Sequence, residues 1–253
     1  GGLAPRTILH HHALISAMLQ DAVEWGYIPY NPASRIKPPK VEVKEAKHYD
    51  LIQTLDLLLA LEDQSIKYKL LVSLELLTGL RAGEITGLEW GDFDYEKKTI
   101  TISRASQYVP GQGIITKSPK NPTSIRTIAL PDCLMPLIWE YEEWQVNLED
   151  KMGDLWHYSG RIFTKQNGEP MFPNTPSCWF PGFLKSHNLP PLNFHGLRHT
   201  NASILIGEGL DIKSVSERLG HSKTSTTLNI YIHLLSVVDR NSANILEKLF
   251  GTY

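Results

Sequence analysis

Two arginines, two histidines and a tyrosine lie in sharply defined local sequences that suit phosphodiester chemistry. Arg81 follows a Thr-Gly-Leu sequence, and Arg198 comes three residues after His195. His221 follows a Leu-Gly pair, and Tyr231 lies ten residues beyond it. A guanidinium group donates paired hydrogen bonds to phosphate oxygens, an imidazole accepts a proton, and a phenol is a nucleophile. These residues predict a site that holds a phosphodiester and attacks it without metal or ATP.

Charge is distributed unevenly along the chain. The net charge is −2 and the isoelectric point about 6.6, which argues mildly against a nucleic-acid partner. Between residues 97 and 131, however, no acidic residue occurs. Phosphate binding depends on the local field, so this region either contacts DNA or is a solvated basic hairpin. The cations of this region are Lys97, Lys98, Arg104, Lys117, Lys120 and Arg126.

Bulk composition indicates a globular protein. The 253 residues are 42% hydrophobic and 21% charged. No apolar run reaches the roughly 18–20 residues of a membrane span, and we expect no membrane association and no signal peptide. Cys133 and Cys178 lack metal-ligand spacing. We therefore expect two free, buried thiols in a reducing cytoplasm.

The N-terminal segment predicts one helix followed by a linker. Apolar residues recur at helical spacing over residues 5–27, after which glycine and prolines end the helix. The three histidines at 10–12 point in three directions around a helix, so a shared metal ion is not expected. Prolines among alternating charges over residues 31–50 predict an extended linker and a domain boundary.

The remaining sequence predicts a mainly α fold with a small antiparallel β-sheet, in the α+β class. Asp50 suits the N-cap of a helix through residue 62, and the nearly all-apolar helix at 68–77 is expected to be central. Three alternating segments, at 99–103, 113–117 and 124–128, predict strands of one sheet. Further helices are predicted at 132–151, 177–186, 196–208, 211–218, 224–231 and 236–250.

These motifs together resemble a known family. The sequence Thr-Gly-Leu-Arg-Ala-Gly-Glu is followed by Leu88, Trp90 and Asp92, and downstream come His-Gly-Leu-Arg-His and Leu-Gly-His. The chain resembles tyrosine recombinases of the phage integrase family, and especially integrases of conjugative transposons. The resemblance covers residues 48–250 as a catalytic domain.

The resemblance also implies a domain organisation. Residues 1–35 would be the C-terminal helix of a core-binding domain, apparently truncated, and residues 36–49 an interdomain linker. Residues 50–253 would form the catalytic domain, ending in a C-terminal helix at 236–250.

The resemblance assigns roles to the five residues. Arg81 and Arg198 would contact the scissile phosphate, and His221 would donate to a non-bridging oxygen. His195 would act as general base or proton shuttle, and Tyr231 as the nucleophile that forms a 3′-phosphotyrosine. No cofactor and no metal ion are implied.

Glu84 and His199 lie close in sequence to the two arginines, and each has its own expected role. Glu84 either braces Arg81 or is an ordinary acidic residue at a helix start. His199 is expected to point away from His195 and to serve packing.

The general acid that protonates the leaving 5′-oxygen is the least defined of the roles. Lys120 resembles the family's hairpin lysine, which precedes a Ser-x-Arg strand, here at residues 124–126. The chain has Asn121 and Pro122 where Thr-Lys is usual. Lys117 remains the alternative. The further DNA contacts that we expect are Arg104, Lys117, Arg126, His10, Arg35 and Lys37.

The implied partners are double-stranded DNA at recombination sites, the Holliday junction, and further copies of the chain. The family suggests a tetramer on DNA with exchange of the C-terminal helix, although packing of that helix on its own domain is the alternative. An accessory DNA-bending protein is compatible with this scheme. The expected location is the cytoplasm of a prokaryote, in association with the nucleoid.

Other functions are weighed against this interpretation. Within the same chemistry the chain would be a chromosome-dimer resolvase or a type IB topoisomerase. A non-catalytic DNA-binding regulator would use the basic surface alone. A metal hydrolase built on His221 and His233 lacks the aspartate–histidine spacing of a metal site.

Overall fold

The structure is a computed structural model that describes residues 2–41, 46–117 and 125–220. The chain divides into two compact units, Gly1–Glu45 and Ala46–Tyr253. The division falls inside the predicted linker at 36–49. Each unit is described here by itself.

The first unit contains one long helix and one short one. Helix α1 spans Pro5–Glu24, with a proline at its first position, and the 3₁₀ turn η1 spans Pro32–Arg35. The predicted helix at 5–27 therefore ends three residues early. Asn31 joins the two elements, because its side-chain amide donates to the carbonyl of Ser16 over 2.9 Å. The assignment of this unit to a core-binding domain stays a prediction.

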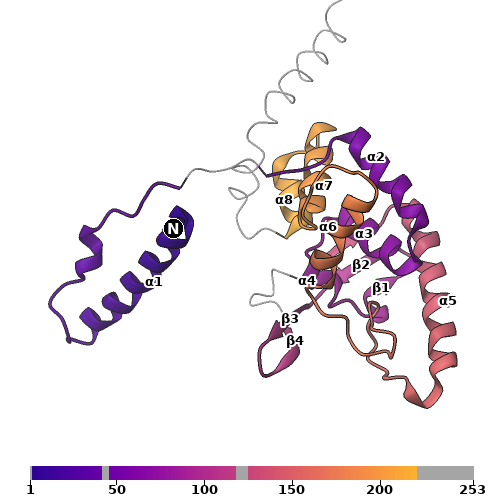
Figure 1. Ribbon diagram of the computed structural model, residues 1–253, viewed down its shortest axis with the longest axis horizontal. Helices are drawn as coiled ribbons and strands as arrows, with labels where there is room; N and C mark the ends of the chain where they lie inside the picture. Colours follow the sequence, from indigo (N-terminus) through magenta and orange to yellow (C-terminus); the bar gives the residue numbers. More distant parts are fainter. Residues whose placement is uncertain (1, 42–45, 118–124, 221–253) are drawn as a thin grey trace, which may run out of the picture. The chain divides into compact units, whose positions relative to one another are not determined.

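The second unit is mainly helical, and helix α3 lies at its centre (Figure 1). Most of α3 is buried, and it packs against α5 and α7. This confirms the expectation drawn from its nearly all-apolar sequence. The helices are α2 Leu51–Ala60, α3 Ile66–Thr78, α4 Ala82–Ile85, α5 Met135–Met152, α6 Thr175–Ser186, α7 Gly196–Gly207 and α8 Ile212–Leu219. The 3₁₀ turns are η2 Leu61–Asp63, η3 Trp90–Asp92, η5 Asp132–Leu134 and η6 Gly153–Leu155.

Local sequence signals explain where several of these helices begin. Asp50 caps α2 as predicted. Its carboxylate accepts a hydrogen bond of 2.8 Å from the backbone N–H of Gln53, and the Gln53 side chain accepts one from the backbone N–H of Asp50. Asp211 caps α8, since its carboxylate accepts hydrogen bonds from the backbone amide and the hydroxyl of Ser214. The predicted helices at 224–231 and 236–250 lie outside the described residues.

The strands form two separate sheets, which corrects the predicted single sheet. Strands β1 (Phe93–Asp94), β2 (Thr99–Ile102) and β5 (Arg126–Ala129) make a three-stranded antiparallel sheet in the order β1-β2-β5. Strand β4 (Gly113–Lys117) instead pairs with β3 (Ala105–Val109) in a two-stranded hairpin that extends from the helical body (Figure 1). The prediction omitted β3, whose short turn to β4 favours a local pairing over a distant one.

The two cysteines are exposed, so the prediction of buried thiols was wrong. Cys133 and Cys178 lie in η5 and α6, where neighbouring side chains, Leu134 and Phe180, turn to the core instead. In a helical turn only some positions face inward, and the presence of a cysteine does not by itself show that its position is one of them. Among the described residues, no helix is long and apolar enough to cross a membrane.

Replacing Gly79 with alanine should destabilise the second unit by about 2–4 kcal/mol. Gly79 ends α3 with φ = 69°, and a Cβ there would lie 2.4 Å from Leu219 Cδ2. The measurement is the midpoint of urea unfolding. Gly182→Ala, in α6 with open space around the site, is the control and should stabilise slightly. Equal behaviour of the two variants would contradict the argument.

Candidate active site

Arg198 is fixed at the end of the central helix. It is the third residue of α7 and only 1% exposed. Its Nη1 donates to the carbonyl of Gly79 over 2.5 Å. One helical turn further on, the Asn201 side chain donates to the carbonyl of Leu76 over 2.8 Å. These bonds hold the guanidinium group at the turn that leads from α3 to Arg81.

Arg81 lies two residues after Gly79, at the N-cap of α4, with its side chain 41% exposed. Its Nη1 donates to Glu84 Oε1 over 2.8 Å, and its Nη2 to the carbonyl of Gly220 over 3.3 Å. Gly220 ends α8 with φ = 68° and directly precedes His221. Chain segments about 140 residues apart therefore meet at Arg81.

The structure thus brings together Arg81, Arg198 and the end of α8. Of the other predicted catalytic residues, His195 lies at the N-cap of α7, and Lys120, His221 and Tyr231 lie outside the described residues. Of these, His221 follows directly on a described residue that contacts Arg81.

Glu84 binds two arginines. This supports the interpretation that it braces Arg81 over the alternative that it is an ordinary acidic residue at a helix start. Besides Arg81, it accepts hydrogen bonds of 2.8 and 3.2 Å from Arg126, whose Nε donates to the carbonyl of Arg218 over 3.0 Å. Burial opposes the ionisation of Glu84. The hydrogen bonds and charge of Arg126, with the charge of Arg81, outweigh it and lower the pKa to about 2.

His195 and His199 lie close together at the start of α7, which corrects the expectation that His199 points away. The two ring centroids are 4.9 Å apart and the rings meet edge to face. Residues four apart share one face of a helix, so this proximity follows from their spacing. Burial, and then the charges of Arg198 and Arg81, lower the pKa of His195. Burial, with His195 and Arg198, lowers the pKa of His199 to about 4.

Most cations of the basic region are already paired with carboxylates. Lys97 pairs with Asp94, Lys98 with Asp132, and Arg104 with Asp92 and Glu89, at 2.5–3.2 Å. Arg126 is 11% exposed and pairs with Glu84. Within residues 46–117 and 125–220, no ion pair involves Lys117, which is exposed at the end of β4. The local excess of positive charge is therefore smaller in the folded protein than in the sequence.

The three predicted DNA contacts of the first unit lie on its surface. His10, Arg35 and Lys37 are all exposed. The guanidinium group of Arg35 lies 4.8 Å from the centre of the Tyr30 ring. The role of these residues toward DNA stays a prediction.

Glu75 is a buried residue of this region that the sequence interpretation missed. It lies on α3 with no exposed surface, and neither carboxylate oxygen has a hydrogen-bond partner among the described residues. Burial raises its pKa well above the usual range, although the charge of Arg198 acts in the opposite direction. The sequence feature that could have indicated this buried carboxyl group is a single acidic residue inside an apolar helix. Within the described parts of the chain, no three acidic, histidine or cysteine side chains form a potential metal site.

Comparison with known proteins identifies the family. The model of the phage integrase family matches residues 48–236. The chain belongs to the phage integrase family. It is a tyrosine recombinase, and the family catalyses site-specific DNA recombination through a phosphotyrosine intermediate. The mainly α fold with small antiparallel sheets is confirmed by the same comparisons.

The similarity to relatives and to solved structures covers most of this recombinase. It is 31% identical to a XerC-like tyrosine recombinase of Caldanaerobacter subterraneus, covering 98% of the chain and 68% of that protein. The ICEBs1 integrase of Bacillus subtilis is 26% identical, with 98% and 67% covered. A structure of the Tn1549 transposon integrase with transposon right end DNA has a TM-score of 0.82 and 24% identity, with 97% and 80% covered.

Glu84→Gln should lower the free energy of unfolding of the recombinase at pH 7 by about 3 kcal/mol. A carboxyl pKa lowered from 4.5 to about 2 gives stability that is full above about pH 4.5. That stability is lost as the pH falls through about 2. Unfolding by denaturant at several pH values measures the difference. Glu169→Gln, which breaks an exposed pair with Lys165, is the control. A gap between wild type and Glu84→Gln that stays constant down to pH 2 would refute this account.

Glu75→Gln should have the opposite pH dependence. A raised carboxyl pKa means that the folded protein holds the proton more tightly than the unfolded chain does. The resulting stability is full below the unfolded pKa and is lost as the pH rises through the folded one. Glutamine has a similar shape and no such loss. The variant should therefore melt at a higher temperature than wild type at pH 8, and the advantage should shrink toward pH 5. A variant less stable at pH 8 would show that Glu75 is ionised.

Proposed function

We propose that this tyrosine recombinase integrates and excises a mobile DNA element, with Tyr231 as the nucleophile. The observation that supports this proposal most is the meeting of Arg81 and Arg198 at the turn between α3 and α4. Arg198 bonds to the carbonyl of Gly79, two residues before Arg81, and Arg81 bonds to the residue before His221. Two guanidinium groups at one turn suit a single phosphate.

In the proposed reaction, Arg81, Arg198 and His221 bind the non-bridging oxygens of the scissile phosphate. They stabilise the charge of the pentacovalent transition state. His195 accepts the proton of the Tyr231 hydroxyl, whose oxygen forms a bond to phosphorus. The bond from phosphorus to the 5′-oxygen breaks, and Lys120 or Lys117 protonates that oxygen. The product is a 3′-phosphotyrosine. A 5′-hydroxyl of the other DNA site then attacks this phosphorus and gives its proton to the same lysine, the bond from phosphorus to the Tyr231 oxygen breaks, and His195 returns the proton to Tyr231, which completes the exchange of that strand.

The lowered pKa of His195 supports its role as base. A general base must be unprotonated at the working pH, and an imidazole with an ordinary pKa near 6.5 is only partly so. Burial and the charges of Arg198 and Arg81 favour the neutral ring. The proton acceptor would therefore be ready at neutral pH.

The proposed partners follow from the relatives. The Tn1549 transposon integrase has been solved with transposon right end DNA and with circular intermediate DNA, and a lambda integrase dimer with a core site. For this chain we infer double-stranded recombination sites and a Holliday junction as substrates. We further infer a tetramer with exchange of helix 236–250, accessory DNA bending, and action at the nucleoid of a prokaryotic cytoplasm. Residues 1–35 would be the end of a core-binding domain.

A nicked suicide DNA duplex tests the reaction. The wild-type protein should form a protein–DNA adduct that resists SDS, because loss of the short 5′ fragment prevents religation. Tyr231→Phe should form no adduct yet retain DNA binding, since only the nucleophilic oxygen is removed. Gel electrophoresis measures the adduct, and a mobility shift measures binding.

A matched control strengthens this experiment. Tyr158 is 83% exposed, and Tyr158→Phe should form the adduct at the wild-type rate. Arg198→Lys should slow adduct formation about a hundredfold or more, because an ammonium group cannot reproduce the paired hydrogen bonds. An adduct that persists in Tyr231→Phe would exclude this nucleophile. DNA binding by the wild type without any adduct would favour a non-catalytic regulator.

A further inference from the structure

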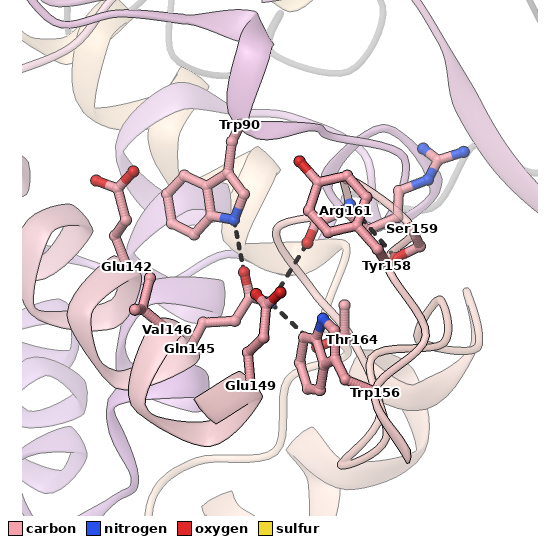
Figure 2. A pocket seen from close by; sticks show the side chains of 11 residues that line it. Trp90, Glu142, Gln145, Val146, Glu149, Trp156, Tyr158, Ser159, Arg161 and Thr164 are labelled. Carbon is pink, nitrogen blue, oxygen red and sulfur yellow. Dashed lines mark hydrogen bonds between the residues drawn. The ribbon is translucent and has the colours of Figure 1, made fainter. Parts of the chain in front are cut away.

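Arg161 is a buried arginine outside the set of residues discussed above. It lies in the segment between α5 and α6 and is 8% exposed. Figure 2 shows it at the wall of a pocket of about 230 Å³, with its guanidinium group extending away from the pocket. On the pocket side, Gln145 donates to the carbonyls of Arg161 over 3.3 Å and Ile162 over 2.8 Å. The backbone of Arg161 is thus fixed on the body of the second unit.

The guanidinium group joins two parts of the chain. Its Nη1 donates to the carbonyl of Gly87, in the segment that follows α4. Its Nη2 donates to the hydroxyl of Thr116 over 2.5 Å, on strand β4. Its Nε lies 3.7 Å from Glu89 Oε1. A planar group with rigid donors suits this bridging, which a lysine cannot reproduce.

The bond to Thr116 reaches a hairpin whose strand β4 has no sheet partner other than β3. Strands β3 and β4 pair only with each other, apart from the three-stranded sheet, and an isolated hairpin is marginally stable. Apart from the pairing with β3, the Arg161–Thr116 bond is the only hydrogen bond among the described residues that ties β4 to the second unit. Thr116 directly precedes Lys117, and its side chain is exposed.

Strand β3 is held from the other side by the segment that carries Arg81. A Cβ on Gly83 would lie 2.9 Å from the carbonyl oxygen of Ser106, and a Cβ on Gly87 would lie 3.1 Å from Ala105 Cα. The absence of side chains there allows the backbones to touch. The Ser106 hydroxyl donates to the carbonyl of Thr86 over 3.2 Å. The base of the hairpin is therefore built onto α4 and the residues that follow it.

We propose that Arg161 is a positioning residue that, through Thr116, sets the end of β4 relative to the Arg81 turn. It thereby orients Lys117, the residue directly after Thr116, for protonation of the leaving 5′-oxygen. The inference rests on the proposed function and takes Lys117, one of its two candidate general acids, as the proton donor. In this role the buried guanidinium group acts through Thr116 and not on the reacting atoms. It acts by limiting where the strand that precedes the lysine can lie.

Thr116→Val tests the inference with two suicide substrates. One has the natural 5′-oxygen at the scissile phosphate, and the other has a bridging sulfur at that position. An oxygen leaving group needs a proton as its bond to phosphorus breaks, whereas sulfur departs as a stable thiolate and needs none. If Thr116 orients the proton donor, the variant should form the adduct about tenfold or more slowly with oxygen. With sulfur it should match the wild type.

The control variants separate positioning from general damage. Thr116→Ser keeps the hydroxyl and should restore the wild-type rate with oxygen. Thr101→Val makes the same exchange on β2, where the hydroxyl lies 3.1 Å from that of Thr127, and should leave both rates unchanged. Arg161→Lys should reproduce the oxygen-selective loss. Thr116→Val is the decisive variant, because its exposed site makes misfolding a small concern.

The outcomes are distinct. Equal loss on both substrates, or a wild-type rate of Thr116→Val with oxygen, would overturn the inference while leaving the proposed function intact. A wild-type protein that forms no adduct with either substrate would overturn the proposed function, and the inference with it.

Discussion

The arrangement of the site depends on the ion pairs that the carboxylate of Glu84 forms with two arginines. It binds Arg81 on its own helix and Arg126 on strand β5, and Arg126 in turn donates to the carbonyl of Arg218 near the end of α8. Three elements that are distant in sequence are thus fixed around one negative charge. Breaking one partner of a buried ion pair leaves an uncompensated charge, so these elements are energetically coupled. The position of Arg81 is consequently set by its bonds to Glu84 and to the carbonyl of Gly220 at the end of α8.

Two buried carboxyl groups lie near the arginines, and their environments differ. Glu84 has hydrogen-bond donors from both Arg81 and Arg126, and its pKa is lowered to about 2. Glu75 lies deeper, and desolvation dominates there, so that its pKa is raised. A carboxyl group is ionised in the interior only when its lone pairs are satisfied. The charge of Arg198 acts against this rise in the pKa of Glu75, but burial has the larger effect.

The sequence predicted much of this fold and site, because the informative residues act locally. The central position of α3 followed from its apolar residues, and the cap of α2 from Asp50. Arg81 and Arg198 were selected from their motifs, and the structure brings them to one turn, while their role toward a phosphate stays a prediction. What sequence reasoning missed depends on contacts between distant segments. The separate β3–β4 hairpin and the bridging role of Arg161 are of this kind.

The local charge of the basic region was also predicted poorly from the positions of its residues in the sequence. The basic region at 97–131 contains no carboxylate, yet Lys97, Lys98 and Arg104 pair with carboxylates that flank it in sequence or space. Local charge in the folded state is set by neighbours across the surface, which a linear count does not include. The lysine at the end of β4, Lys117, differs from these because no such pair involves it among the described residues.

The same positive charges that suit phosphate binding also control the base in the proposed reaction. In the protein without DNA, burial and then the charges of Arg198 and Arg81 lower the pKa of His195 and so favour the neutral ring. A phosphate bound between the arginines adds negative charge and weakens that effect. The imidazole then becomes a stronger proton acceptor at the moment when the tyrosine must lose its proton. Substrate binding and activation of the nucleophile would therefore be coupled through electrostatics in the proposed reaction.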